Sequence, residues 1–238
     1  MKKPVVDYRE FRLSRLNEPR FSHLKLLAGW LVYFVMYALT EHLIPPERCH
    51  VIHCWLDDVI PFCEAFVVPY YLWFALVAGT LLYFMLYDTD SFRRLSVFII
   101  ITQAVAMAVY IIYPNRQDLR PEVMPRENVF TWVLRFTYAF DTNTGVCPSL
   151  HVAYSVGIAS TWLKYRQVPR WFKALIVALA ALISLATAFI KQHSFVDIFA
   201  ALALGALAEA VVYRDWWLRR LRRRAGQRRR AAHKKGAG

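Results

Sequence analysis

Long apolar runs constrain this chain more than any other feature of its sequence. Six runs, each with its flanks, are about long enough to cross a bilayer as helices. We place the six spans at residues 24–43, 62–87, 95–113, 152–163, 172–190 and 196–213. Hydrophobic residues make up 58% of the chain, which suits a membrane protein better than a soluble domain. The sequence therefore predicts an all-α integral membrane protein, a bundle of six transmembrane helices.

The polar segments divide the chain into three parts. Residues 1–23 form a basic N-terminal segment, residues 24–213 the membrane domain, and residues 214–238 a basic tail that we expect to be disordered. The first apolar run follows a polar segment and precedes no small-residue cleavage site, so we expect it to remain as a span. The third loop, residues 114–146, is the longest. Within it, residues 127–140 have apolar side chains at helical spacing, which predicts a helix on the membrane surface.

The positive charges predict the orientation of the chain. Six spans place both termini on one side of the membrane, and 24 of the 30 Lys and Arg residues fall on that side. The positive-inside rule then makes the termini cytoplasmic and the 114–146 loop extracytoplasmic. The net charge of +13 lies between and beyond the apolar runs, so it indicates orientation in a cell membrane and contact with anionic lipid, not binding of nucleic acid. The sequence does not indicate an oligomeric state.

The four cysteines match no zinc-knuckle spacing. Cys49, Cys54 and Cys63 share one loop region, so a Cys49–Cys54 or a Cys54–Cys63 disulfide is open to them if that face is oxidising. Free thiols near the interface are the alternative.

Two histidines mark the candidate site. Two spans separate His151 from His193, so the chain returns to the side it left and both residues lie at the same membrane face. His193 and Asp197 are four residues apart at the expected start of a helix, which places them on one helix face. The carboxylate can hold one ring nitrogen and leave the other as a nucleophile or base. His151, one turn into its helix, can protonate a departing alkoxide. These groups are suited to phosphoryl chemistry.

Further residues supply groups that hold phosphate. Pro148 suits the first turn of a helix, whose free backbone N–H groups bind anions, and Ser149 adds a hydroxyl donor. Arg116 and Arg120 can bind phosphate oxygens through their bidentate guanidinium groups. Lys191 adds a point charge close to the second histidine.

These residues lie in three motifs that resemble those of the type 2 phosphatidic acid phosphatase superfamily. The superfamily has the motifs Lys-x6-Arg-Pro, Pro-Ser-Gly-His and Ser-Arg-x5-His-x3-Asp. Their cores are matched here by Arg120-Pro121, Pro148-Ser149-Leu150-His151 and His193-x3-Asp197. The resemblance spans about residues 113–205. It implies that His193 is a nucleophile that forms a phosphohistidine and that Asp197 orients it. It also implies that His151 is the general acid, that Arg120 and Ser149 bind phosphate, and that no metal or other cofactor takes part.

The chain departs from these motifs at several positions. Tyr113 occupies the Lys position of the first motif, Leu150 replaces the Gly of the second, and Thr187 replaces the Arg of the third. Arg116 and Lys191 are candidates to supply the missing charge. The sequences around both histidines resemble the inositol phosphorylceramide synthase branch, whose members transfer a phosphorylated head group between lipids.

We therefore expect a membrane-embedded lipid phosphatase or phosphotransferase that acts on a lipid phosphate or phospholipid at the extracytoplasmic face. Transfer of an inositol-phosphoryl head group between lipids is the alternative, for which Asp141 and Asn143 could hydrogen-bond a hydroxylated acceptor. Two other hypotheses are a metal-dependent hydrolase and a non-catalytic carrier or scaffold for anionic lipid. The hydrolase would use His151, His193, Asp197 and Cys147 as ligands, residue types that bind zinc.

Overall fold

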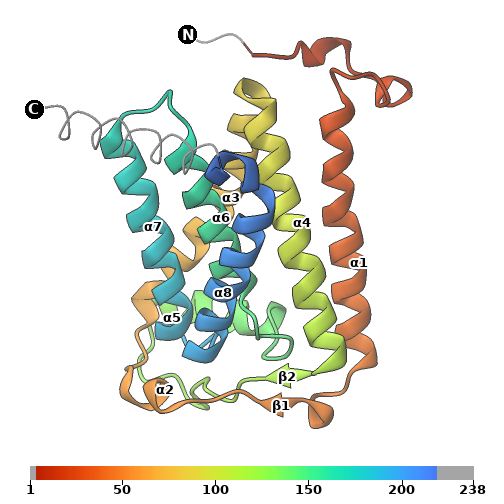
Figure 1. Ribbon diagram of the computed structural model, residues 1–238. Helices are drawn as coiled ribbons and strands as arrows, with labels where there is room; N and C mark the ends of the chain where they lie inside the picture. Colours follow the sequence, from red (N-terminus) through yellow and green to blue (C-terminus); the bar gives the residue numbers. More distant parts are fainter. Residues whose placement is uncertain (1–3, 219–238) are drawn as a thin grey trace, which may run out of the picture.

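Figure 1 shows the computed structural model of the chain, which describes residues 4–218 as a mostly helical bundle. Within this range, five helical segments are long and apolar enough to cross a membrane. They are Ser22–Leu43, Glu64–Tyr87, Thr89–Ile112, Arg170–Phe189 and Phe195–Val212. The prediction of a mostly helical chain with helices suited to cross a membrane is thereby confirmed, whereas the predicted span at residues 152–163 is not among the five.

Six helices make up the bundle, and α6 lies at its centre. The helices are α1 (Ala28–Leu43), α3 (Val67–Tyr87), α4 (Thr89–Ile112), α6 (Leu150–Lys164), α7 (Arg170–Phe189) and α8 (Phe195–Val212). The 3₁₀ turns η3 (Ser22–Leu27) and η5 (Glu64–Phe66) lead into α1 and α3. The central helix packs against α3, α4, α7 and α8, whereas α1 packs against α4 and η3 (Figure 1). Nine of the 15 residues of α6 are buried, so this helix forms the core of the bundle.

The connection between α3 and α4 differs from the sequence prediction. We predicted a turn over residues 88–94, but the structure has only Asp88 between the two helices. The Asp88 carboxylate accepts hydrogen bonds from the backbone N–H of Ser91 at 3.2 Å and from its hydroxyl at 3.0 Å. This N-cap satisfies the first turn of the next helix. Helix α4 therefore begins six residues before the apolar run does.

The end of the bundle opposite the termini carries the shorter elements. They are η4 (Pro46–Arg48), β1 (His50–Val51), α2 (Trp55–Val59), β2 (Asn115–Arg116) and α5 (Val129–Phe140). The two strands pair in parallel, with His50 opposite Asn115 (Figure 1). Asn115 also fixes the entry to α6, because its Oδ1 accepts hydrogen bonds from the backbone N–H groups of Val146 and Cys147.

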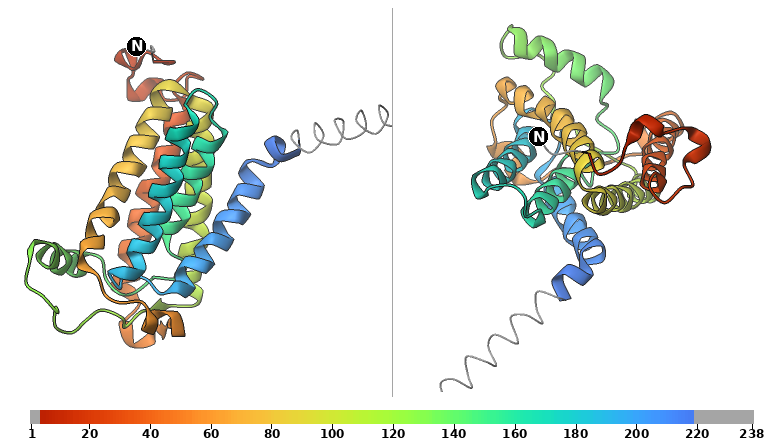
Figure 2. Two further views of the ribbon diagram at one scale, coloured as in Figure 1. Left: turned by 90° about the vertical axis from the view of Figure 1, so that its left-hand side faces the viewer. Right: turned by 90° about the horizontal axis from the view of Figure 1, so that it is seen from above.

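Helix α5 was predicted over residues 127–140 and is observed at Val129–Phe140. The Asn128 side chain caps it by accepting a hydrogen bond from the backbone N–H of Thr131 at 3.0 Å. The helix packs against the adjoining end of α3 and projects outside the bundle (Figure 2). Its outer side exposes large apolar side chains, among them Trp132 and Phe140.

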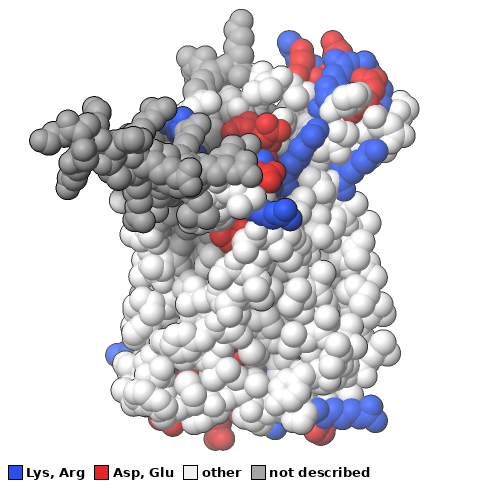
Figure 3. All heavy atoms as spheres, viewed as in Figure 1, with Lys and Arg blue, Asp and Glu red and all other residues white. Residues whose placement is uncertain are grey.

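The charged side chains lie at the two ends of the bundle and leave an uncharged belt between them on the face shown in Figure 3. The basic N-terminal segment is described from Pro4 onward and contains the 3₁₀ turns η1 (Tyr8–Glu10) and η2 (Leu13–Arg15). Of the tail predicted to be disordered, residues 214–218 are helical, which differs from that prediction, and residues 219–238 lie outside the described residues. All four cysteines are free thiols, so neither candidate disulfide is present.

The close packing of α6 against α4 generates a stability prediction. A Cβ added at Gly157 would lie 2.5 Å from Cδ1 of Phe98, and Phe98 is fully buried. We expect Gly157→Ala to lower the free energy of unfolding by about 1–3 kcal/mol, because the core has no room for the methyl group. Thermal unfolding in detergent would measure this loss. Gly79→Ala in α3 is the matched control, since its Cβ would meet nothing within 4 Å. Equal melting temperatures for the two variants would contradict the packing.

Candidate active site

His193 and Asp197 form a hydrogen-bonded pair at the start of α8. The His193 Nδ1 atom lies 3.1 Å from Oδ2 of Asp197, and Asp197 is fully buried. The same carboxylate oxygen accepts a hydrogen bond from the backbone N–H of Ser194 at 3.0 Å. We predicted that the two residues share a helix face, but they do not, because α8 begins only at Phe195. The pair forms because Asp197 reaches back to cap its own helix. With Nδ1 held in this way, Nε2 is the ring nitrogen available to a substrate.

His151 lies beside His193, as the return of the chain predicted. The two ring centroids are 5.7 Å apart, with the ring planes 62° from each other. The His151 ring contacts two aromatic rings of α3, Tyr70 at 4.7 Å and Trp73 at 4.4 Å between centroids. Its Nε2 atom is buried and has no hydrogen-bond partner among the described residues. These contacts fix the ring in place and leave its polar edge for a ligand.

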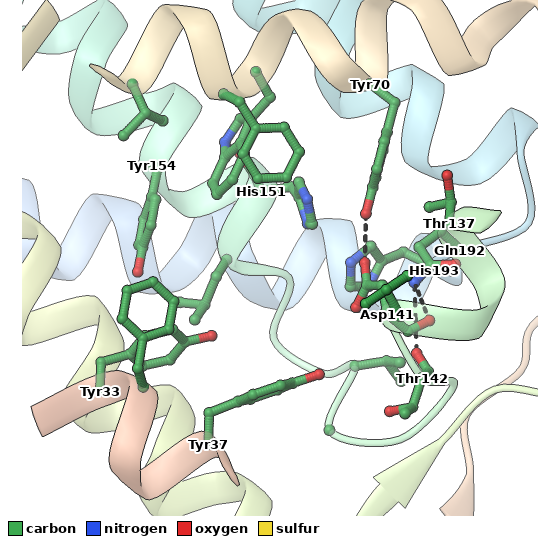
Figure 4. A pocket seen from close by; sticks show the side chains of 18 of the residues that line it. Tyr33, Tyr37, Tyr70, Thr137, Asp141, Thr142, His151, Tyr154, Gln192 and His193 are labelled. Carbon is green, nitrogen blue, oxygen red and sulfur yellow. Dashed lines mark hydrogen bonds between the residues drawn. The ribbon is translucent and has the colours of Figure 1, made fainter. Parts of the chain in front are cut away.

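Both histidines line one end of a cavity of about 610 Å³ (Figure 4). The cavity lies between α1, α3, α6 and the loop that follows α5. Its wall is mainly aromatic and apolar, and the titratable lining residues other than tyrosines are Asp141, His151 and His193. Within residues 4–218, no Lys or Arg belongs to this lining. A ligand that enters the cavity thus meets two imidazoles and one carboxylate.

Asp141 is the carboxylate that faces this cavity. Its Oδ2 atom accepts a hydrogen bond of 2.5 Å from the Tyr70 hydroxyl, and Figure 4 shows this contact next to His193. Its backbone carbonyl accepts a hydrogen bond from the Gln192 side-chain amide at 3.2 Å. We predicted for Asp141 only a contact with an acceptor, because an acidic residue in a loop without a motif does not indicate its partners.

Arg120 lies one layer behind the cavity wall. Its guanidinium group donates hydrogen bonds to the Gln192 side-chain oxygen at 2.9 Å and to the Tyr138 carbonyl at 3.1 Å, and it also bonds to the Asp141 carbonyl. It lies over the Tyr138 ring at 4.4 Å. Burial lowers the pKa of Arg120. Gln192, which lines the cavity, separates this cation from the two histidines.

Lys191 and Arg116 lie away from the histidine rings. The Lys191 Nζ atom donates hydrogen bonds of 2.6 Å to the backbone carbonyls of Asp57 and Ile60, at the end of α2. Burial lowers the pKa of Lys191. Arg116 belongs to β2 and forms an ion pair of 3.2 Å with Asp118. The structure thus brings neither of these two predicted phosphate ligands into the cavity.

Ser149 lies at the N-cap of α6 and is fully buried. Its backbone N–H donates to the carbonyl of Asp197 at 3.2 Å, which joins the start of α6 to the start of α8. Its hydroxyl has no hydrogen-bond partner among residues 4–218. Pro148 precedes this cap, so it lies just outside the helix and not in the first turn that we predicted.

Asp57 is a structural residue of the site that the sequence did not reveal. Its carboxylate accepts hydrogen bonds from the Ser194 hydroxyl at 2.6 Å and from the backbone N–H of Phe195 at 2.9 Å. It is 4% exposed and holds the start of α8 from a distance of 137 residues in sequence. No local pattern signals such a contact.

The residues considered for a metal site do not form one. Among the described residues, no group of three or more His, Cys, Asp and Glu side chains is arranged to hold a metal ion. Burial, together with the nearby Asp197 carboxylate, raises the pKa of the Cys147 thiol to about 12. Cys147 is therefore a neutral thiol near pH 7.

Comparisons of the chain with family models, with curated proteins and with solved structures found no match.

The position of Lys191 generates a prediction that separates a structural role from phosphate binding. Lys191→Met should lower the free energy of unfolding by about 1–3 kcal/mol, because it leaves two buried carbonyls without a donor. Lys173→Met is the matched control, since Lys173 donates to a single carbonyl at an exposed position. Chemical unfolding in detergent would measure both variants. If Lys191→Met left the stability unchanged but abolished phosphate binding, Lys191 would be a phosphate ligand after all.

Proposed function

We propose that this protein is a membrane-embedded enzyme that cleaves a phosphate ester of a lipid phosphate through a phosphohistidine intermediate on His193. The observation that carries the proposal is the His193–Asp197 pair next to His151 at one end of an aromatic cavity in a helix bundle. The motif resemblance supports the same assignment of roles. No metal ligand set is needed for these steps.

The chemistry proceeds in two displacements. Nε2 of His193 attacks phosphorus, so a P–N bond forms while the P–O bond to the lipid alcohol breaks. His151 gives a proton to the departing alkoxide. Water then loses a proton to His151 and attacks the phosphohistidine, which breaks the P–N bond and releases phosphate. Asp197 stabilises the charge on His193 throughout, because it is bonded to Nδ1.

The remainder of the cavity supports a lipid as substrate. Away from the histidines, α1 and α3 line it with apolar side chains such as Trp30, Phe34, Phe74 and Leu81. A wall in which such side chains predominate is suited to an acyl chain. A lipid phosphate would place its phosphate at the histidines and its chain along α1 and α3.

We further propose that α6 is a sixth span and that α5 lies on the membrane surface. Helix α6 has 15 residues and is enclosed by other helices, so it need not be as long or as apolar as a lipid-facing span. The apolar outer side of α5 is suited to the interface. By the positive-inside rule, the termini would be cytoplasmic and the two-histidine cavity would open to the extracytoplasmic leaflet.

Head-group transfer is a second candidate, favoured by the charge of the cavity lining. A phosphomonoester dianion would meet the Asp141 carboxylate and no lining cation, whereas a phosphodiester carries only one negative charge. The Tyr70 hydroxyl binds Oδ2 of Asp141, and Oδ1 accepts no hydrogen bond within the described part of the chain. That oxygen is suited to hold the hydroxyl of an alcohol acceptor against the phosphohistidine.

Replacing each histidine tests the covalent mechanism. Purified protein is incubated with lipid phosphates and phospholipids, and released phosphate and new lipid products are followed. His193→Ala should abolish turnover. His151→Ala should also lose turnover but recover in part with an activated leaving group, which needs no proton. Wild-type protein should acquire labelled phosphate in an acid-labile bond. His193→Ala protein should acquire none.

His42→Ala is the control, because His42 is exposed on α1 and bonds only to a helix carbonyl. Substantial activity in His193→Ala would exclude the phosphohistidine. Loss of wild-type activity on chelation, with recovery on adding zinc, would favour the metal-dependent hydrolase instead.

Replacing Asp141 separates transfer from hydrolysis. Asp141→Asn keeps an oxygen for the Tyr70 hydroxyl but removes the charge that would hold an acceptor. With inositol, diacylglycerol or ceramide added, we expect it to lower the ratio of transferred to released phosphate by about tenfold, the effect of a lost charged hydrogen bond. Asp118→Asn is the control, since Asp118 pairs with Arg116 outside the cavity lining. An unchanged ratio would remove Asp141 from acceptor binding.

A further inference from the structure

A second cavity, of about 310 Å³, lies at the opposite end of the bundle. It is enclosed by the first turns of α4, the end of α6 and the end of α8. His151 is in the first turn of α6, whereas Lys164 ends that helix and lines this second cavity. At 1.5 Å per residue, the two cavities are about 20 Å apart along α6. The second cavity is therefore a separate feature, on the side of the termini.

Among residues 4–218, three cationic side chains line the second cavity: Arg94, Lys164 and Arg166. The Arg94 guanidinium donates one hydrogen bond to the Val212 carbonyl at 3.0 Å and lies 5.7 Å from the centroid of the Tyr213 ring. Arg166 is exposed on the loop that follows α6. Since a guanidinium group has five N–H donors, the Arg94 contact leaves it capacity to bind a phosphate.

Two acidic groups offset part of this charge. Glu209 lies behind the wall and forms a 2.5 Å ion pair with Lys164. Asp88 lines the cavity, but both its oxygens are used by Ser91 to cap α4. Within the described part of the chain, Arg94 and Arg166 therefore carry the charge that is not paired with a carboxylate in the wall. The described lining remains positive, with three cations against one carboxylate.

Aromatic side chains and the adjoining sequence place this cavity at a lipid interface. Lys164 lies 4.2 Å from the centroid of the Tyr213 ring and 5.0 Å from that of Trp216, and both aromatic residues line the cavity. Tyr and Trp are enriched where a membrane meets water. The sequence that continues past Leu218 contains ten Lys and Arg residues, and basic residues that follow a membrane helix in sequence attract anionic lipid.

We propose that the second cavity binds the phosphate-bearing head group of an anionic phospholipid from the leaflet on the side of the termini. The arginines would bind the phosphate oxygens, and Tyr213 and Trp216 would contact the glycerol region. Basic pockets between membrane helices are a common means of holding such head groups. This inference does not rest on the proposed catalytic function, because it uses none of the residues of the two-histidine cavity.

Lipid binding by matched arginine variants tests the proposal. Full-length protein in detergent is titrated with phosphatidylglycerol or phosphatidylcholine of the same acyl chains, and bound lipid is counted by native mass spectrometry. Arg94→Gln and Arg166→Gln should each weaken phosphatidylglycerol binding about fivefold, as expected for one cation near the lipid. Arg93→Gln is the control, since Arg93 is exposed, adjacent in sequence and bonded to Ser22 outside the cavity. Phosphatidylcholine has the same phosphate but a choline cation that offsets its charge, so it should bind the wild-type protein more weakly than phosphatidylglycerol and lose less affinity in the two cavity variants.

The possible outcomes separate the sources of the ligand. An equal loss in Arg93→Gln, or no loss in either cavity variant, would overturn the proposal, because general surface charge would then explain the binding. Displacement of phosphatidylglycerol by millimolar inorganic phosphate would assign the cavity to free phosphate and overturn the head-group assignment. Arg166→Gln keeps the test decisive if Arg94→Gln misfolds, since Arg166 is exposed on a loop.

Discussion

The buried carboxylate of Asp197 is the constraint on which the rest of the site depends. It is fully buried in an apolar bundle, where an unpaired charge would be costly, so its position requires hydrogen-bond donors. His193 and the backbone of Ser194 provide them for Oδ2, whereas the buried Oδ1 has no hydrogen-bond partner among the described residues, and the Asp197 carbonyl accepts a hydrogen bond from the backbone N–H of Ser149. One residue thereby fixes the nucleophile that we propose and joins the start of α8 to the start of α6, which carries His151. Asp57 supports the same helix start from the α2 side.

Backbone carbonyls of the loops next to the cavity accept hydrogen bonds from cationic side chains that could otherwise bind a phosphate. Irregular backbone near a membrane has carbonyl groups that need donors, because neither helix nor sheet satisfies them. Lys191 donates to the carbonyls of Asp57 and Ile60, and Arg120 donates to those of Tyr138 and Asp141. Among the described residues, the titratable side chains of the cavity wall other than tyrosines are therefore Asp141 and the two histidines. For the lipid phosphate substrate that we propose, this placement of charge favours a phosphodiester over a phosphomonoester dianion.

The two ends of the bundle differ in the chemistry that they place next to lipid. The end near α2 and α5 carries imidazoles, a carboxylate and tyrosine hydroxyls in an aromatic cavity. The end near the termini carries arginines, a lysine and a tryptophan in a smaller cavity. Helix α6 connects the two, because its first turn contributes His151 and its last residue is Lys164. On the two proposals made above, the protein turns over lipid in one leaflet while it holds lipid of the other.

The sequence by itself determined the helices and the pairing of the two histidines. Apolar run length and the helical spacing of apolar residues are local signals, so the long helices and α5 could be predicted. The two long apolar runs between His151 and His193 sufficed to predict that the histidines lie together. Only the tertiary structure decided where the cations go. Lys191 and Arg120 are close to the histidines in sequence or motif, yet their partners are carbonyls up to 134 residues away. The helix start at Thr89 and the contact of Asp57 with Ser194 were also decided there. A charged side chain binds the donor or acceptor that folding brings nearest, and the order of residues along the chain does not specify which one that is.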